Sequence, residues 1–181
     1  MTGMRKMLAG RQSMPTPNPV FIPHLAPITV TSSLPDIATC PVFSKTMAFQ
    51  CRASNVKHAL EVRTLGEYTV IWLAIMNLQL HVAAVGIVPK HAKVAGKDIA
   101  RASVSDRVGV IVGAGLDVLS NCVTGSSGQR EPFGFTYIDA DKENNWQYFD
   151  MAVGMSKPGA CIYVDNIVRH GDLVKKELIK A

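Results

Sequence analysis

The sequence predicts an α/β fold in which a doubly wound, mainly parallel β-sheet carries helices on both faces. Beyond residue 50, short apolar runs alternate with segments of helical periodicity. Strands separated by helices are joined by right-handed crossovers, which leave neighbouring strands parallel. The 181 residues are 48% hydrophobic and 18% charged, which is typical of one globular domain with room for a tail.

The expected elements follow one another in a regular order. Apolar runs predict strands at residues 58–62, 81–88, 108–112, 135–138 and 161–164. Helical patterns begin near Tyr68 and at Pro89, and cover 116–123 and 144–155. The composition of 124–131 predicts a loop, and Lys157-Pro158-Gly159 is expected to close the last helix.

Charge and cysteine content argue against several classes of protein. The net charge is +5, but the chain after residue 50 carries 15 basic and 13 acidic side chains, so no nucleic-acid-binding surface is expected. The cysteines are widely spaced and include no C-x-x-C pair, which argues against a zinc site and a disulfide scaffold. We expect a cytoplasmic protein with reduced thiols at Cys40, Cys51, Cys122 and Cys161.

Residues 1–32 are expected to form a poorly ordered segment in front of a single domain at 33–181. The opening segment is basic and has no acidic side chain before Asp36. A mitochondrial presequence is the alternative interpretation, since such segments are basic and poor in acids. Against it, an amphipathic helix would be interrupted by Pro15, Pro17, Pro19, Pro23 and Pro27.

An uncharged stretch from Tyr68 to Pro89 is long enough to span a bilayer. Its centre holds Asn77, Gln79 and His81, and polar groups are most costly at that depth. A buried helix, a polar turn and a core strand account for the same residues, because a parallel strand is apolar on both faces. We therefore expect no membrane span, with a small membrane-associated protein as the alternative.

Polar side chains directly follow two consecutive predicted strands. Asp139 ends the fourth strand, and Asp165 and Asn166 follow the fifth. The carboxyl ends of parallel strands meet at one edge of a sheet, where open α/β folds bind ligands. Carboxylate and amide oxygens suit Mg²⁺ or Ca²⁺. The alternative is that these are ordinary turn-forming and helix-capping residues, which are common after strands.

The segments IDADKENNWQYFDMA and SKPGACIYVDNIVRHG resemble the cation-dependent O-methyltransferases of the caffeoyl-CoA and catechol type. The resemblance extends back through SDRVGVIVGAGLDVL, VPKHAKVAGKDIARA and LEVRTLGEYTVIWLA to SLPDIATCP, and so covers roughly residues 33–172. It implies a Rossmann-like class I methyltransferase fold that lacks the last strands. It also implies S-adenosyl-L-methionine, a divalent cation (Mg or Ca) and a phenolic or catechol-like small-molecule acceptor of secondary metabolism, with a homodimer as an option.

Matched position by position, the resemblance assigns three roles. The expected metal ligands are Asp139, Asp165 and Asn166, and Lys142 is the expected general base near the acceptor hydroxyl. A metal-bound phenol ionises more readily, and its phenolate oxygen would attack the sulfonium methyl of the cofactor in line. The expected cofactor-binding residues are Glu61, Gly66, Tyr68, Thr69, Gly113, Ala114 and Asp139.

Three departures from the family's pattern support an alternative. Arg63 and Glu67 stand where the family has glycines in its first loop, and Gly86 stands where it has the acid for the ribose hydroxyls. The chain also ends at Ala181, before the family's last strands, which would leave a sheet edge uncovered. The alternative is a catalytically impaired pseudoenzyme, or a binding or dimerisation partner of the same fold.

Overall fold

The structure, a computed structural model of the chain, describes residues 39–63, 68–86, 88–124 and 131–167. It contains a five-stranded sheet in which every neighbouring pair is parallel and the strand order is β3-β2-β1-β4-β5. This order confirms the predicted doubly wound sheet. The strands are β1 (His58–Arg63), β2 (His81–Gly86), β3 (Val108–Val112), β4 (Phe133–Asp139) and β5 (Ser156–Val164).

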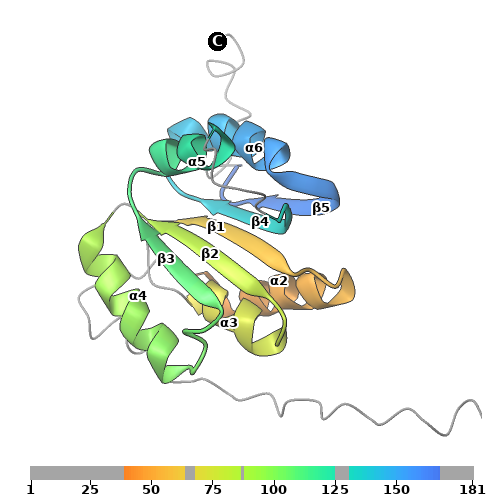
Figure 1. The fold of residues 1–181 in the computed structure, drawn as a ribbon, viewed down its shortest axis with the longest axis vertical. Helices are drawn as coiled ribbons and strands as arrows, with labels where there is room; N and C mark the ends of the chain where they lie inside the picture. Colours follow the sequence, from red (N-terminus) through yellow and green to blue (C-terminus); the bar gives the residue numbers. More distant parts are fainter. Residues whose placement is uncertain (1–38, 64–67, 87, 125–130, 168–181) are drawn as a thin grey trace, which may run out of the picture.

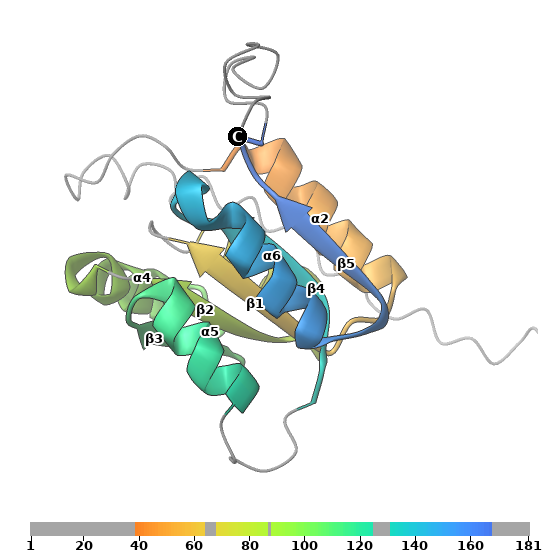
Figure 2. The same cartoon turned by 90° about the horizontal axis from the view of Figure 1, so that it is seen from above.

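Helices cover both faces of this sheet, as predicted (Figure 1). The face that carries the larger core is covered by α2 (Pro41–Ala53), α3 (Tyr68–Met76) and α4 (Pro89–Arg101). The opposite face is covered by α5 (Gly115–Thr124) and α6 (Asn145–Gly154), and a short 3-10 helix, η1 (Lys142–Asn144), leads into α6. Seen from above, α5 and α6 lie over the sheet and run roughly along its strands (Figure 2).

Strands β1 and β4 are buried on both faces along nearly their whole length, which explains their continuous apolar runs. Side chains alternate along each strand, so one set enters the α2–α4 core and the other the α5–α6 core. Phe135 and Tyr137 of β4 enter the first core and Ile138 the second, whereas Phe133 enters the second core because the register shifts between Phe133 and Phe135. Every β4 residue before Asp139 is buried. Because these side chains are packed, the carboxyl end of the strand, where Asp139 lies, is held in place.

The uncharged stretch that begins at Tyr68 forms α3, a polar turn and β2, as predicted. Helix α3 has nine residues, and Asn77 ends it by donating from Nδ2 to the carbonyl of Leu73 at 2.9 Å and to that of Ala48 at 3.1 Å. Such side-chain contacts satisfy carbonyls that a helix end leaves open. None of the helices in the described part of the chain is long and apolar enough to cross a membrane.

The structure differs from the expected elements in two places. Helix α2 was not predicted, although it begins with a proline at its first positions and buries residues at helical spacing, namely Ser44, Met47, Ala48 and Cys51. Lys157-Pro158-Gly159 does not close a helix but lies inside β5, which starts at Ser156. The described sheet ends at β5, and a proline is tolerated on an edge strand; Gly159 adopts a φ of +79° near an irregularity in the β4–β5 register.

Replacing Phe135 by alanine should test the packing of the first core. The Phe135 side chain is fully buried between β4 and α2–α3, so we expect the free energy of unfolding to fall by ~3–5 kcal/mol. Urea unfolding followed by circular dichroism measures this change. Phe49→Ala is the matched control, because Phe49 is 57% exposed on α2 and its loss should cost less than about 0.5 kcal/mol. Equal losses in the two variants would contradict this packing.

Candidate active site

The site is organised at the carboxyl ends of β1 and β4, where the order of the strands reverses. From β1 the chain proceeds outward to β2 and β3, and then returns to the other side of β1 as β4. At such a switch point two loops leave the sheet in opposite directions and open a crevice. The β1–β4 register pairs Arg63 with Asp139, so these two residues face each other at the start of that crevice.

Asp139 is contacted by two basic side chains. Lys142 donates from Nζ to Oδ1 at 2.6 Å, and Arg63 places Nε 3.4 Å from Oδ2. The Arg63 side chain is only 4% exposed and that of Asp139 14%, so water screens this pair little. Asp139 and Lys142 thus lie together, as the resemblance implied, but the contact with Arg63 was not expected.

Arg63 is held from its other side by a hydroxyl pair. Its Nη1 donates to Oγ1 of Thr39, which lies 3.2 Å from the hydroxyl of Tyr137. Tyr137 is fully buried below this contact, and burial raises the pKa of its hydroxyl. The guanidinium is therefore fixed in a planar fork between a hydroxyl and a carboxylate, a geometry that lysine cannot reproduce.

Asp165 lies beside Asp139, as expected from the two strand ends. Its backbone N–H donates to the carbonyl of Ile138 at 2.9 Å, which continues the β4–β5 pairing by one residue. Burial raises the pKa of the Asp165 carboxyl, and the nearby charge of Asp139 raises it further. Asn166 follows with a φ of 55° and donates from Nδ2 to Oδ2 of Asp165 at 3.0 Å. The three predicted metal ligands are thus neighbours.

Their arrangement does not fit a divalent ion. Mg²⁺ and Ca²⁺ need several oxygen ligands whose lone pairs point at one centre. Asp139 directs both of its oxygens at basic groups, and Asn166 turns its amide nitrogen toward Asp165.

A cavity of about 290 Å³ opens next to this edge, above the ends of β1 and β2. Ligand pockets usually measure ~300–1,000 Å³, so the cavity is at the lower end of that range. Its lining combines apolar side chains with a few polar ones, among them Arg63, Asp117 and Asp141. The described lining residues are Val62, Arg63, Val85, Gly86, Gly113, Ala114, Gly115, Leu116, Asp117, Ala140, Asp141, Asn144 and Tyr148.

Two glycines in one wall of this cavity leave no room for a side chain. A Cβ on Gly113 would lie 2.7 Å from Val118, and a Cβ on Gly115 would lie 2.8 Å from the ring of Tyr148. Both distances are shorter than side chains tolerate. The Gly113 N–H donates to the carbonyl of Gly86 at 3.0 Å, which anchors the turn to the end of β2. The sequence Gly113-Ala114-Gly115 is therefore a requirement of close packing around the cavity.

A hydrogen-bonded group closes the cavity on the β4 side. The Tyr148 hydroxyl donates to Oδ1 of Asp141 at 2.6 Å, and Nδ2 of Asn144 donates to Oδ2. Partial burial opposes ionisation of Asp141, but these hydrogen bonds together outweigh it, so the pKa of Asp141 is lowered. Tyr148 itself is buried, and burial followed by the contact with Asp141 raises its pKa.

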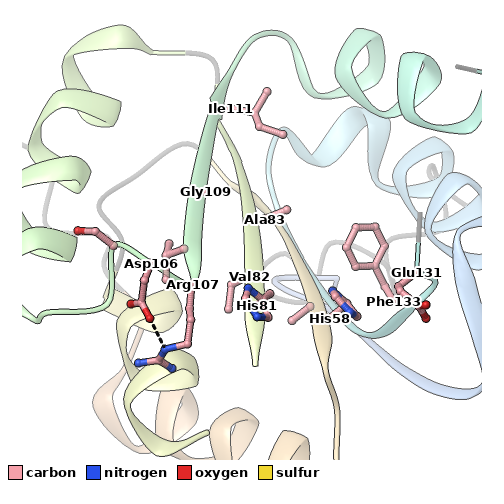
Figure 3. A pocket seen from close by; sticks show the side chains of 13 residues that line it. His58, His81, Val82, Ala83, Asp106, Arg107, Gly109, Ile111, Glu131 and Phe133 are labelled. Carbon is pink, nitrogen blue, oxygen red and sulfur yellow. Dashed lines mark ion pairs between the residues drawn. The ribbon is translucent and has the colours of Figure 1, made fainter. Parts of the chain in front are cut away.

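A second cavity, of about 380 Å³, lies at the opposite edge of the sheet, where the strands begin (Figure 3). It contains the first residues of β1 and β2, His58 and His81, whose rings stack with centroids 5.9 Å apart. Asp106 and Arg107 form an ion pair at 3.5 Å on its rim. Open α/β sheets bind ligands at the carboxyl ends of their strands, so the cavity beside Asp139 is the candidate active site.

Comparison with known proteins agrees with this geometry. The sequence matches the model of the O-methyltransferase family over residues 12–180. This chain belongs to the O-methyltransferase family. It is 49% identical to the O-methyltransferase imqG of Aspergillus flavus over 81% of this chain and 60% of the relative. It is 39% identical to a catechol O-methyltransferase of Mycobacterium tuberculosis over 79% of this chain and 63% of that protein. The chain thus spans less than two thirds of the length of either relative.

Solved structures of the family share the fold. The O-methyltransferase of Bacillus cereus, solved in complex with SAH, superposes with a TM-score of 0.77 at 35% identity. The match covers 86% of this chain and 72% of the Bacillus protein. The predicted class I methyltransferase architecture is therefore confirmed.

The residues predicted to bind the cofactor lie in different places, and one of them, Asp139, is the end of β4 already described. Gly113 and Ala114 line the cavity. Glu61 and Thr69 belong to the α2–α3 side of the sheet: Glu61 is 1% exposed in β1, and the hydroxyl of Thr69 lies 3.2 Å from that of Ser44. Tyr68 starts α3 and packs its ring edge-on against Trp72, with centroids 6.4 Å apart. Gly66, like Glu67, lies outside the described residues, and these assignments stay predictions.

Sequence reasoning missed at least five polar residues of the site, one of which is Asp141. Thr39 supports Arg63, Tyr137 supports Thr39, and Tyr148 with Asn144 holds Asp141. Asp141 and Tyr148 are seven residues apart, which is two helical turns, so their spacing was a usable signal. Thr39 and Tyr137 are 98 residues apart, and only the folded sheet brings them together.

Tyr148→Phe should raise the pKa of Asp141 and reduce stability at neutral pH. Because the folded pKa is lowered, the Asp141 contribution is present above the unfolded pKa and lost as pH falls through the folded pKa. We expect a loss of ~0.5 kcal/mol at pH 7, kept small because Asp141 is largely solvent-exposed, and a smaller loss below about pH 3. NMR titration of the Asp141 carboxyl and urea unfolding at both pH values measure the two effects. A Tyr163→Phe control should show no such pH dependence, and a pH-independent loss in Tyr148→Phe would contradict the role of the hydrogen bond.

Proposed function

We propose that this protein is an S-adenosyl-L-methionine-dependent O-methyltransferase that methylates a hydroxyl of a phenolic or catechol-like small molecule. The observation that carries the proposal is the cavity between the Gly113–Gly115 turn and Asp141, which adjoins Asp139 and Lys142 in a chain of the O-methyltransferase family. A cofactor cavity next to a polar, partly buried edge is what transfer between two bound molecules requires. Catechol acceptors are supported by the name of the Mycobacterium relative.

The cavity suits an adenosine-containing cofactor. Gly86 provides no carboxylate for the ribose hydroxyls. A residue larger than glycine at this position would need backbone movement, because its Cβ would lie 3.0 Å from the carbonyl oxygen of Arg63. Asp117, in the first turn of α5, lines the same cavity and offers carboxylate oxygens to a diol. When bound, S-adenosyl-L-methionine supplies an electrophilic methyl group on a sulfonium, which leaves as a neutral thioether once the acceptor oxygen has taken the methyl.

Lys142, in its neutral form, is the group that we propose takes the proton from the acceptor hydroxyl. Its Nζ contacts Asp139, which directly precedes the cavity-lining residues Ala140 and Asp141, and this carboxylate orients the amine. Removing the proton raises the electron density on the attacking oxygen. The remaining contribution is positioning, because an in-line displacement at carbon depends on the alignment of three atoms.

Assistance by a divalent cation stays a prediction of the resemblance, as do a homodimer and a cytoplasmic location. The contacts of Asp139 with Arg63 and Lys142 argue against the divalent cation.

Wild-type protein should bind S-adenosyl-L-methionine in calorimetric titration, and Gly115→Ala should weaken that binding. The added Cβ would meet the Tyr148 ring at 2.8 Å and force the ring into the cavity, so we expect affinity to fall about tenfold or more. Gly96→Ala is the matched control, since nothing lies within 4 Å of a Cβ at that exposed position of α4. Unchanged affinity in Gly115→Ala would show that the cofactor does not bind in this cavity. No binding by wild type would favour the pseudoenzyme interpretation.

Lys142→Met should abolish methyl transfer to catechol while leaving cofactor affinity unchanged. Positioned acid–base groups contribute ~10²–10⁴ in rate, so kcat should fall by that factor. Product formation measured by mass spectrometry over a range of pH reports the loss. Lys93→Met, at an exposed position of α4, should keep the wild-type rate. A Lys142→Met enzyme with a normal rate and pH profile would remove Lys142 from the mechanism.

A further inference from the structure

Both carboxylate oxygens of Asp139 already face a basic side chain in this structure. Lys142 Nζ lies 2.6 Å from Oδ1, and Arg63 Nε lies 3.4 Å from Oδ2. A divalent ion that bound Asp139 would have to displace one of these two groups or share an oxygen with it. Either change places the ion beside a fixed positive charge.

Displacing Arg63 is costly because the guanidinium is buried, donates a hydrogen bond to Thr39 and forms an ion pair with Asp139. It lies in β1, 5% exposed, with Thr39 on one side and Asp139 on the other. The β1–β4 register holds Arg63 directly opposite Asp139, so the side chain cannot leave without losing both partners. A buried cation separated from its carboxylate is strongly unfavourable.

The edge is also balanced in charge without an added ion. In the resting state, in which Lys142 is protonated, two carboxylates, Asp139 and Asp165, lie with two cations, Arg63 and Lys142. A divalent ion would give this partly buried group a net positive charge. The chain itself supplies the positive charge that the two carboxylates would otherwise attract as a metal ion.

We propose that Arg63 is the resident cation of this edge, and that its guanidinium takes the place of a divalent metal between Asp139 and the acceptor. The chain then binds Mg²⁺ and Ca²⁺ weakly, and methyl transfer proceeds without either. The catalytic half of this inference rests on the proposed function, whereas the metal-binding half does not.

Direct titration of the full chain with Mg²⁺, Ca²⁺ and Mn²⁺ tests the proposal, read by thermal shift and by the electron paramagnetic resonance signal of free Mn²⁺. Arg63→Gln and Arg63→Met remove the charge, and Arg63→Lys keeps it. Arg101→Met is the control, because Arg101 pairs with Asp98 at 3.9 Å on the distant helix α4. Wild type, Arg63→Lys and Arg101→Met should bind weakly, whereas the two neutral variants should bind about tenfold or more tightly. Adding Asp165→Ala to Arg63→Gln should abolish that gain.

Two outcomes would overturn the proposal: wild-type binding as tight as that of the neutral variants, or no gain in either neutral variant. If neither neutral variant folds, the wild-type protein alone decides. Tight Mn²⁺ binding by wild type then refutes the inference. Weak Mn²⁺ binding together with methyl transfer that is insensitive to EDTA supports it. Failure of the proposed function looks different, because a chain without methyl transfer can still show the predicted pattern of metal binding. An active enzyme that loses its activity in EDTA would overturn the inference and leave the methyltransferase proposal intact.

Discussion

The carboxylate of Asp139 is the point on which the rest of the site depends. It ends the most deeply buried strand of the sheet, next to the position where strand order reverses, and two basic side chains from different elements converge on it. A charged group at this depth is tolerable only when it is paired and hydrogen-bonded. Arg63 from β1 and Lys142 from η1 meet this requirement, and in doing so they fix where β1, β4 and the start of α6 lie relative to one another.

Packing of apolar side chains holds the carboxyl end of β4, and with it Asp139, in a fixed position. Phe135 and Tyr137 anchor one face of β4 and Ile138 the other, so the strand cannot slip by one residue without exposing a row of buried side chains. The same register sets Arg63 opposite Asp139. Packing in the two cores therefore determines an electrostatic contact at the surface of the crevice.

Much of this arrangement could be predicted from the sequence because it depends on local patterns. Alternating apolar runs and helical periods gave the sheet and its crossovers, and strand ends gave the neighbours Asp139 and Asp165. The first residues of β5 were misjudged because Lys-Pro-Gly is a turn signal except on an edge strand next to a register irregularity. The contact of Arg63 with Thr39 and Asp139 could not be predicted, since it depends on side-chain direction and on residues from three separate segments. Local sequence identified Arg63 only as a departure from a glycine.

Arg63 also connects the two halves of the site. Its side chain lines the cavity and at the same time reaches Asp139, so it contacts both the proposed cofactor space and the proposed acceptor edge. Replacing a buried ion pair by apolar residues of similar volume is often neutral or stabilising, so stability alone gives little reason for an arginine at this position. The proposed function at the edge does, because a fixed, fully ionised group is preorganised to stabilise a developing phenolate without reorganisation of water. The position that departs from a glycine in the family's loop is, in the folded chain, the residue that contacts both the cavity and the carboxylate edge.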